Sequence, residues 1–121
     1  MHRDLDLLRK IVLAIEDAPG GWAPRRLEVD GYTRSQISYH AHLLVDAGLA
    51  EGRDVTHQQS EGPEALITSL TWSGHEFAEA ARDESRWNKA LGVVQEKGGA
   101  VTMGVLTQLL ISLMKGAFGI P

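Results

Sequence analysis

The stretch from residue 33 to residue 50, TRSQISYHAHLLVDAGLA, carries signals for both ends of a helix. Thr33 is a favourable N-cap, because its hydroxyl can accept a hydrogen bond from a backbone N–H that the first helical turn leaves without a partner. Gly48 stands where the helix must end, since glycine enters the left-handed conformation at least cost. Between these two residues, the apolar residues that recur at helical spacing are Ile37, Ala41 and Leu44. The sequence therefore predicts a short helix that is capped at both ends.

The opposite face of this predicted helix carries polar side chains. His40 lies next to the apolar stripe, and we expect a half-buried histidine with satisfied ring nitrogens rather than a metal ligand. His40 and His42 are two residues apart, so on a helix they point to different faces and cannot bind one metal ion together. The side chains that can donate hydrogen bonds outward are Arg34, Ser35, Ser38, Tyr39 and His42.

The residues before this helix predict two further elements. Apolar residues at helical spacing predict an amphipathic helix over residues 3–17, which the run Ala18-Pro19-Gly20-Gly21 ends. In residues 22–32, Leu27 and Val29 alternate with charged neighbours. This pattern indicates a short strand that ends in a turn at Asp30-Gly31.

Two strands with a polar turn between them are predicted after Gly48. Residues 49–56 and 65–72 are expected to form the strands, because the second is rich in the branched and aromatic residues that strands favour. The intervening run HQQSEGPE predicts a mobile hairpin tip. Arg53 at the base of the tip is its one reliable cation, whereas Glu61 and Glu64 do not favour contact with phosphate.

Two more helices are predicted before the C-terminal segment. Thr71 is a suitable N-cap for a helix that continues to about residue 83. The next segment has Trp87, Leu91 and Val94 at helical spacing and ends at Gly98-Gly99. We expect these three residues to be core rather than a cofactor site.

The final segment predicts a helix that is apolar on most of its circumference. Thr102 can cap a helix over residues 103–119, and a helix of this kind is buried on several sides. We therefore expect it to pack against a second copy of the chain across a two-fold axis, with burial inside one chain as the alternative. A membrane span is disfavoured, because residues 100–114 are fewer than the roughly 20 that a bilayer requires. The expected interface residues are Met103, Leu106, Leu109, Leu110, Leu113 and Met114.

Composition limits the function classes. The chain has 121 residues, enough for one domain, and no cysteine, so it has no disulfide, thiolate metal ligand or cysteine nucleophile. We find no catalytic, glycine-rich phosphate-binding or metal-ligand motif, and expect no enzyme activity, no metal and no cofactor. A charged N-terminus without a signal peptide favours a cytoplasmic protein. The net charge of −4 counts against nucleic-acid binding unless basic residues cluster locally.

The run ISYHAHLLVDAGLA resembles the recognition helix of winged-helix regulators of the ArsR and MarR type, although the metal sensors of the ArsR group use cysteine ligands that this chain lacks. Leu70-Thr71-Trp72-Ser73-Gly74 resembles the step from the last wing strand into the next helix in these families. The resemblance implies a mainly α fold with a small β wing. It places a winged helix-turn-helix domain over residues 1–84 and a C-terminal helical extension, expected to dimerise, over residues 85–121. The matching residues of the first run are Ser38, His40, Leu44, Ala47, Gly48 and Leu49, whereas Ala41 and Ala50 are smaller than usual.

The chain as a whole also resembles a bacterial and phage family, the domain of unknown function 2513. This family implies no assigned activity, and its occurrence in phage and prophage genomes favours a regulatory or host-directed role. The matching runs are Arg3-Asp4-Leu5-Asp6-Leu7, Ile37-Ser38-Tyr39-His40, Leu70 to Phe77, Arg82-Asp83, Trp87-Asn88-Lys89 and Lys97-Gly98-Gly99.

Two functions of different classes follow. In the first, the protein is a dimeric DNA-binding transcriptional regulator whose residue 33–50 helix enters the major groove. Arg34 would contact a guanine edge and Gln36 an adenine edge, since each side chain can make two parallel hydrogen bonds there. In the second, the same scaffold binds a host or phage protein and does not bind DNA. The side chains expected to contact DNA are Arg34, Ser35, Gln36, Ser38, Tyr39, His42, Arg53, His57, Gln58 and Gln59.

Overall fold

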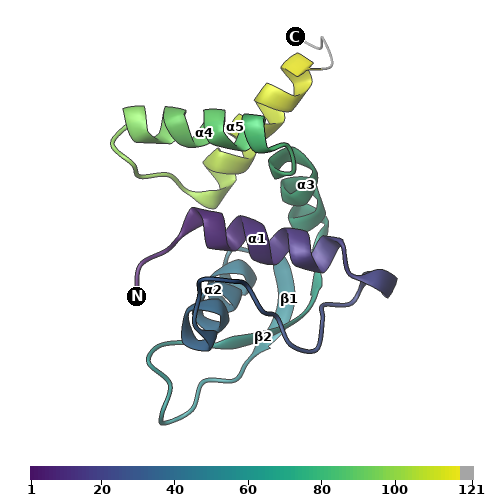
Figure 1. The fold of residues 1–121 in the computed structure, drawn as a ribbon, viewed down its shortest axis with the longest axis vertical. Helices are drawn as coiled ribbons and strands as arrows, with labels where there is room; N and C mark the ends of the chain where they lie inside the picture. The colour runs from purple at the N-terminus through teal and green to yellow at the C-terminus, as the bar shows by residue number, and fades with distance from the viewer. Residues whose placement is uncertain (118–121) are drawn as a thin grey trace. The chain divides into compact units, whose positions relative to one another are not determined.

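The structure is a computed structural model that describes residues 1–117 (Figure 1). Over these residues the chain forms five α-helices, one short 3₁₀ helix and a two-stranded antiparallel sheet. The fold is therefore mainly helical with a small β element, as the sequence predicts. The chain divides into two compact units, one over Met1–His75 and one that begins at Glu76. The functional division expected at residue 84 stays a prediction.

The first helix, α1, spans Leu5–Glu16. It begins later than predicted because Asp4 is its N-cap: the carboxylate of Asp4 accepts a hydrogen bond from the backbone N–H of Leu7. A short 3₁₀ helix, Pro19–Gly21, follows. The predicted amphipathic helix is confirmed with slightly shorter ends, and its buried residues are Leu7, Leu8, Ile11, Val12 and Ile15.

The second helix, α2, spans Arg34–Asp46 and has both predicted caps. Thr33 and Gln36 form a capping box, in which the Thr33 hydroxyl accepts from the Gln36 N–H at 3.1 Å and the Gln36 side-chain oxygen accepts from the Thr33 N–H at 2.8 Å. Past the other end, Gly48 has a φ of +78°. The buried residues of α2 are Ile37, His40, Ala41 and Leu44.

The strands β1, Ala50–Asp54, and β2, Ala65–Leu70, pair in antiparallel fashion and are shorter than predicted. The register shifts between Glu51 and Gly52, so that Thr68 of β2 has no partner residue on β1. At this bulge, the buried side chains of β2 depart from strict alternation along the strand. The buried residues of β2 are Ala65, Ile67 and Leu70, whereas Leu66 is 40% exposed.

The segment over residues 22–32 is not a strand, which corrects the prediction. The backbone N–H of Ala23 donates to the carbonyl of Thr68 at 2.8 Å, and this bond uses the residue that the bulge leaves unpaired. Beyond Ala23, no backbone hydrogen bond joins residues 24–32 to β2, so this segment does not extend the sheet. The predicted turn is present, since the Tyr32 N–H donates to the Val29 carbonyl at 3.2 Å.

The third helix, α3, spans Trp72–Ala81 and begins against the end of α2. The Thr71 hydroxyl accepts from the Gly74 N–H at 3.1 Å, as predicted for an N-cap, and donates to the Gly48 carbonyl at 2.6 Å. The Thr71 N–H donates to the Leu49 carbonyl at 3.1 Å. The sequence run at the end of α2 and the run that starts α3 are therefore bonded directly to each other.

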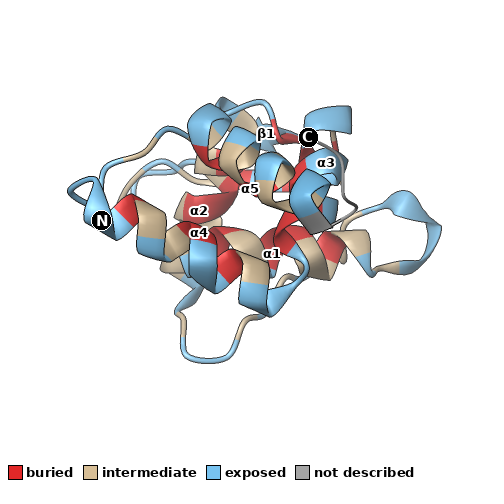
Figure 2. Ribbon diagram, turned by 90° about the horizontal axis from the view of Figure 1, so that it is seen from above, coloured by how far each residue is buried: buried red, intermediate tan, exposed pale blue. Residues whose placement is uncertain are grey.

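In the second unit, α4 spans Glu84–Glu96 and packs against α5, Met103–Ala117. Trp87 is 1% exposed and lies edge-on to Phe77, with ring centroids 6.2 Å apart, which confirms Trp87 as a core residue. The Thr102 hydroxyl accepts from the Val105 N–H at 3.1 Å and caps α5 as predicted. Figure 2 shows buried and exposed segments alternating along the helices, as one-sided burial requires.

The predicted extent of the last helix reaches beyond the described residues. Residues 118 and 119, which the sequence assigns to this helix, lie outside them. Within residues 1–117, no helix combines the length and the apolar character needed to cross a membrane.

Candidate nucleic-acid interface

The polar face of α2 is open to solvent at its first residue and partly covered along the next turns. Arg34 is exposed, whereas Ser35, Ser38, Tyr39 and His42 are half-buried. Tyr39 and His42 are three residues apart and therefore share a face of the helix. Their rings stack with centroids 6.3 Å apart and planes inclined by 29°. This face thus presents a guanidinium at its N-terminal end and an aromatic pair about one turn further on.

Two polar residues of α2 are engaged inside the fold. The side-chain oxygen of Gln36 accepts the capping-box bond from Thr33, so a two-bond contact with adenine would require that bond to break. Base recognition by Gln36 stays a prediction. His40 is 2% exposed and hydrogen-bonded through both ring nitrogens, so it is satisfied, as expected, but buried more deeply than expected.

The hairpin tip is a hydrogen-bonded turn. The His57 N–H donates to the Ser60 hydroxyl at 3.0 Å, and the Ser60 N–H donates to the His57 carbonyl at 3.0 Å. The Gln59 N–H donates to Nδ1 of His57 at 3.2 Å. The side chains of His57, Gln58 and Gln59 remain exposed, as does Arg53 on β1. These four predicted residues are therefore accessible, but contact with DNA stays a prediction for each.

Two carboxylates of the hairpin, Glu64 and Asp54, lie near α2. Hydrogen bonds from the Ser60 and Ser38 hydroxyls lower the pKa of Glu64, and the nearby charges of His57 and Arg34 act in the same direction. The Glu64 side chain is 18% exposed, and its carboxylate stands between the hairpin and the first turns of α2. Hydrogen bonds from the Thr56 hydroxyl and then the Thr56 N–H lower the pKa of Asp54. Both groups are therefore negatively charged at neutral pH.

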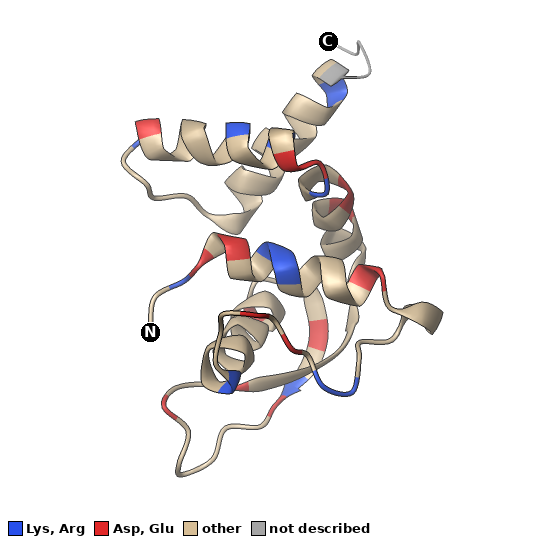
Figure 3. Cartoon of the chain, in the orientation of Figure 1, with Lys and Arg blue, Asp and Glu red and all other residues tan. Residues whose placement is uncertain are grey.

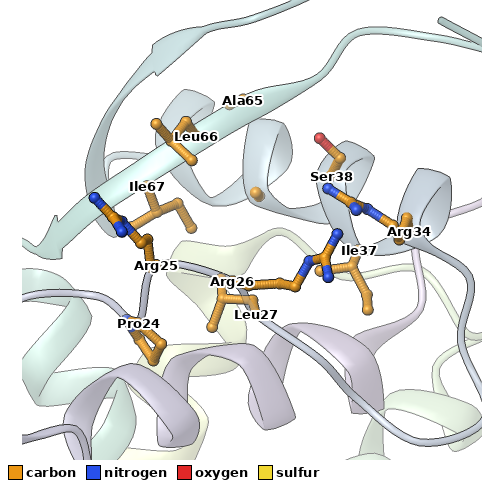
Figure 4. Close-up of a pocket in the computed structure, with 11 residues that line it drawn as sticks. Pro24, Arg25, Arg26, Leu27, Arg34, Ile37, Ser38, Ala65, Leu66 and Ile67 are labelled. Atoms are coloured by element: carbon orange, nitrogen blue, oxygen red, sulfur yellow. The ribbon is translucent and has the colours of Figure 1, made fainter.

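Sequence reasoning missed two arginines in the loop before α2. Arg25 and Arg26 line a cavity of about 140 Å³ together with Arg34, and no acidic residue is among its lining residues (Figure 4). Its lining also includes apolar side chains, among them Ile37 and Ile67. The adjacent arginines are visible in the sequence, but the strand predicted over residues 22–32 gave them no functional role. The loop that replaces that strand instead brings them beside α2.

A second cavity of about 320 Å³ continues along the same loop. It shares Arg26, Leu27, Arg34 and Ile37 with the first, so Arg26 and Arg34 stand at the boundary of the two cavities. Unlike the first cavity, the second is also lined by acidic side chains, Glu28 and Asp30. Of these two cavities, only the first combines arginines with no lining carboxylate.

The residues expected at the dimer interface separate into two groups on α5. Leu106 and Leu110 are fully buried within the single chain. Val105, which was not among the expected residues, is 59% exposed. The remaining expected residues are half-buried: Met103, Leu109, Leu113 and Met114. In the described part of the chain, no three His, Cys, Asp or Glu side chains are grouped so that they could hold a metal ion.

Comparison with known proteins places the chain in a family. A family model described as "Hypothetical protein (DUF2513)" matches residues 2–100, which include α1 to α4 and end before α5. An "Uncharacterized protein" of Haemophilus influenzae is 33% identical over 116 residues, with 90% of this chain and 92% of the relative covered. No solved structure matches the chain. The family match and this relative together show that the chain belongs to the DUF2513 family.

Proposed function

We propose that the protein is a winged-helix DNA-binding protein in which α2 is the recognition helix and the β1–β2 hairpin is the wing. Support comes from the arrangement of the first unit: a helix capped at both ends carries an outward polar face beside a two-stranded antiparallel hairpin. An α-helix fits the major groove of B-form DNA. A hairpin next to it can reach the neighbouring backbone or minor groove.

The observation that carries the proposal is a local concentration of arginines. Arg25, Arg26 and Arg34 line one cavity, and Arg53 pairs across the hairpin with Leu66, which lines the same cavity. Figure 3 shows Lys and Arg in this unit at the start of α2, in the loop before it and on β1. The net charge of −4 therefore does not describe this surface. A local basic patch is the electrostatic feature that attracts a phosphate backbone.

Within this proposal, contacts divide between bases and backbone. The Tyr39–His42 pair and Ser38 on α2 face the groove, where hydroxyl and imidazole groups can hydrogen-bond to base edges. Arg53 and the polar tip residues His57, Gln58 and Gln59 face the adjacent phosphates or the minor groove.

We also propose that the regulator is a homodimer that assembles through α5. The exposed Val105 and the half-buried Leu109 leave apolar surface on this helix. A two-fold dimer would present two α2 helices to half-sites about 34 Å apart. Light scattering should then give twice the chain mass of 13.2 kDa, and Leu109→Glu should give the monomer mass. A monomer at micromolar concentration for the unmodified protein contradicts this part of the proposal.

The DNA-binding proposal is tested by fluorescence anisotropy with short duplexes from the region upstream of the protein's own gene. We expect binding at about 50 mM salt that weakens steeply towards about 200 mM, because bound phosphates release counterions. Arg34→Ala should weaken binding markedly. Lys89→Ala is the control, because it removes a positive charge from α4 in the second unit. An unmodified protein that binds none of these duplexes at the lower salt concentration contradicts the proposal.

One observation favours a protein-interaction module as the second candidate. Trp22 and Trp72 are 68% and 80% exposed, although tryptophan is enriched in protein interfaces rather than on free surfaces. If this candidate is correct, Trp22→Ala and Trp72→Ala abolish capture of a phage or host protein, and the duplexes do not bind. If the protein binds DNA, both variants retain the affinity of the unmodified protein for the duplexes.

A further inference from the structure

Two arginines that line the cavity beside α2 point towards each other. Arg26 belongs to the loop before α2 and Arg34 is the first residue of the helix, and Figure 4 shows their side chains extending towards one another. Arg25 lines the same cavity, but its side chain lies at the other end, near Ile67 of β2. The two facing guanidinium groups therefore belong to segments that the fold, and not the local sequence, brings together.

The charges of this pair are not balanced inside the fold. Among residues 1–117, neither Arg26 nor Arg34 forms a hydrogen bond or ion pair through its guanidinium group. Three carboxylates lie near the pair without bonding to it. Glu64 acts on Arg34 through its charge alone, and Glu28 and Asp30 line the adjoining cavity that Arg26 and Arg34 also line. Two like charges in this arrangement repel each other, and an anion between them would remove the repulsion.

The shape and chemistry of the cavity limit that anion. A volume of about 140 Å³ admits one small group, and no carboxylate among the lining residues competes with it. Guanidinium groups are planar forks of N–H donors that match phosphate oxygens in pairs.

We propose that Arg26 and Arg34 form a clamp for a single phosphate group held between their guanidinium groups in this cavity. This inference deepens the proposed function and rests on it for the source of the phosphate, which is then a phosphodiester of the DNA backbone. It also changes the role of Arg34. The residue positions the N-terminus of α2 on the backbone, and it does not read a guanine edge.

The first experiment tests the clamp without DNA. Inorganic phosphate is added to ¹⁵N-labelled protein at constant ionic strength, with chloride as the replaced anion, and the Nε–H signals of the arginines are followed by NMR. We expect saturable shifts for Arg26 and Arg34. Arg26→Gln should remove the response of Arg34, whereas Arg25→Gln, which removes the same charge from the neighbouring loop position, should retain it. Shifts that do not saturate, or that persist unchanged in Arg26→Gln, overturn the clamp.

The second experiment asks how many phosphates the pair holds. The salt dependence of duplex binding is measured for Arg26→Gln, Arg34→Gln and the double variant. A shared phosphate predicts that the logarithmic salt slope falls by at most about 0.9 in the double variant, whereas two separate phosphate contacts predict a fall of about 1.8. The effects of the single variants should also be less than additive, because both remove the same contact. Lys89→Gln/Lys97→Gln, which removes two positive charges from the second unit, is the charge-matched control.

The two experiments separate failure of the clamp from failure of the DNA proposal. If Arg34→Gln changes the preference among duplex sequences and leaves the salt slope unchanged, Arg34 reads a base and the clamp is wrong, although DNA binding stands. If phosphate binds at Arg26 and Arg34 but no duplex binds, the clamp stands and its phosphate belongs to a small molecule. In that case the DNA-binding proposal fails.

Discussion

The backbone N–H of Asp4 donates a hydrogen bond of 2.8 Å to Nε2 of His40, which lies 36 residues further along the chain. Nδ1 of His40 lies 2.7 Å from the carbonyl oxygen of Gln36. Because Nε2 accepts, Nδ1 must carry the proton and donate to that carbonyl, so the ring is neutral. The carboxylate of Asp4 caps α1 and accepts a bond of 3.0 Å from the Tyr32 hydroxyl. Burial and this bond raise the pKa of Tyr32. The start of α1, the middle of α2 and the end of the loop between them are therefore joined at Asp4.

His40→Leu should lower the free energy of unfolding by about 1–3 kcal/mol, because the Asp4 N–H loses its acceptor while it stays partly buried. Urea denaturation followed by circular dichroism measures the change. His42→Leu is the control, since His42 is half-exposed on the same helix and we expect a change within about 0.5 kcal/mol. Equal stability of His40→Leu and the unmodified protein would show that the hydrogen bond contributes nothing net.

Gly74→Ala should destabilise the protein by about 1–3 kcal/mol, because the new Cβ would overlap the carbonyl oxygen of Leu49, which is backbone and cannot rotate away. Gly92→Ala on α4 meets no atom within 4 Å and should stabilise by about 0.5–1 kcal/mol through the helix propensity of alanine. Thermal unfolding of the two variants compares them directly. A Gly74→Ala variant as stable as the unmodified protein would contradict this close approach.

Glu64→Gln should strengthen duplex binding, because it removes a carboxylate that stands beside Arg34 and Ser38. We expect an increase in affinity of about two- to fivefold at low salt, the size typical of a partly screened charge pair. Anisotropy titrations at two salt concentrations measure it, and the gain should shrink at the higher one. Glu61→Gln, an exposed charge of the same hairpin tip, should give a smaller gain. A loss of affinity in Glu64→Gln would instead indicate that the carboxylate positions Arg34 for binding.

Acid should loosen the hairpin. The pKa values of Asp54 and Glu64 are lowered in the folded protein, so their charged forms stabilise it. That contribution is present above the ordinary carboxyl range and is lost as the pH falls below about 4. The amide signal of Thr56, which donates to Asp54 at 2.8 Å, should therefore titrate with a midpoint below the ordinary aspartate pKa. The transition should be absent in Asp54→Asn, and a midpoint at or above the ordinary value would contradict the bond.

Local signals predicted α2 and the junction with α3 well, because their determinants lie within a few residues. Thr33 caps a helix through the N–H three residues later, and Thr71 does the same for Gly74. The loop over residues 22–32 could not be predicted in this way. Its course depends on the carbonyl of Thr68, which a bulge in a strand more than 40 positions away leaves available. No periodicity within the loop encodes that distant contact.

The sequence by itself determined where helices begin and end and which of their faces are apolar, since caps and stripes act over a single turn of chain. Only the tertiary structure decided which polar side chains are left for a ligand. It buried His40, engaged Gln36 in a capping box, and brought Arg26 to face Arg34 across a cavity. The physical reason is that satisfaction of hydrogen bonds and proximity of charges depend on residues that are distant in the chain. Both are settled only when the segments pack.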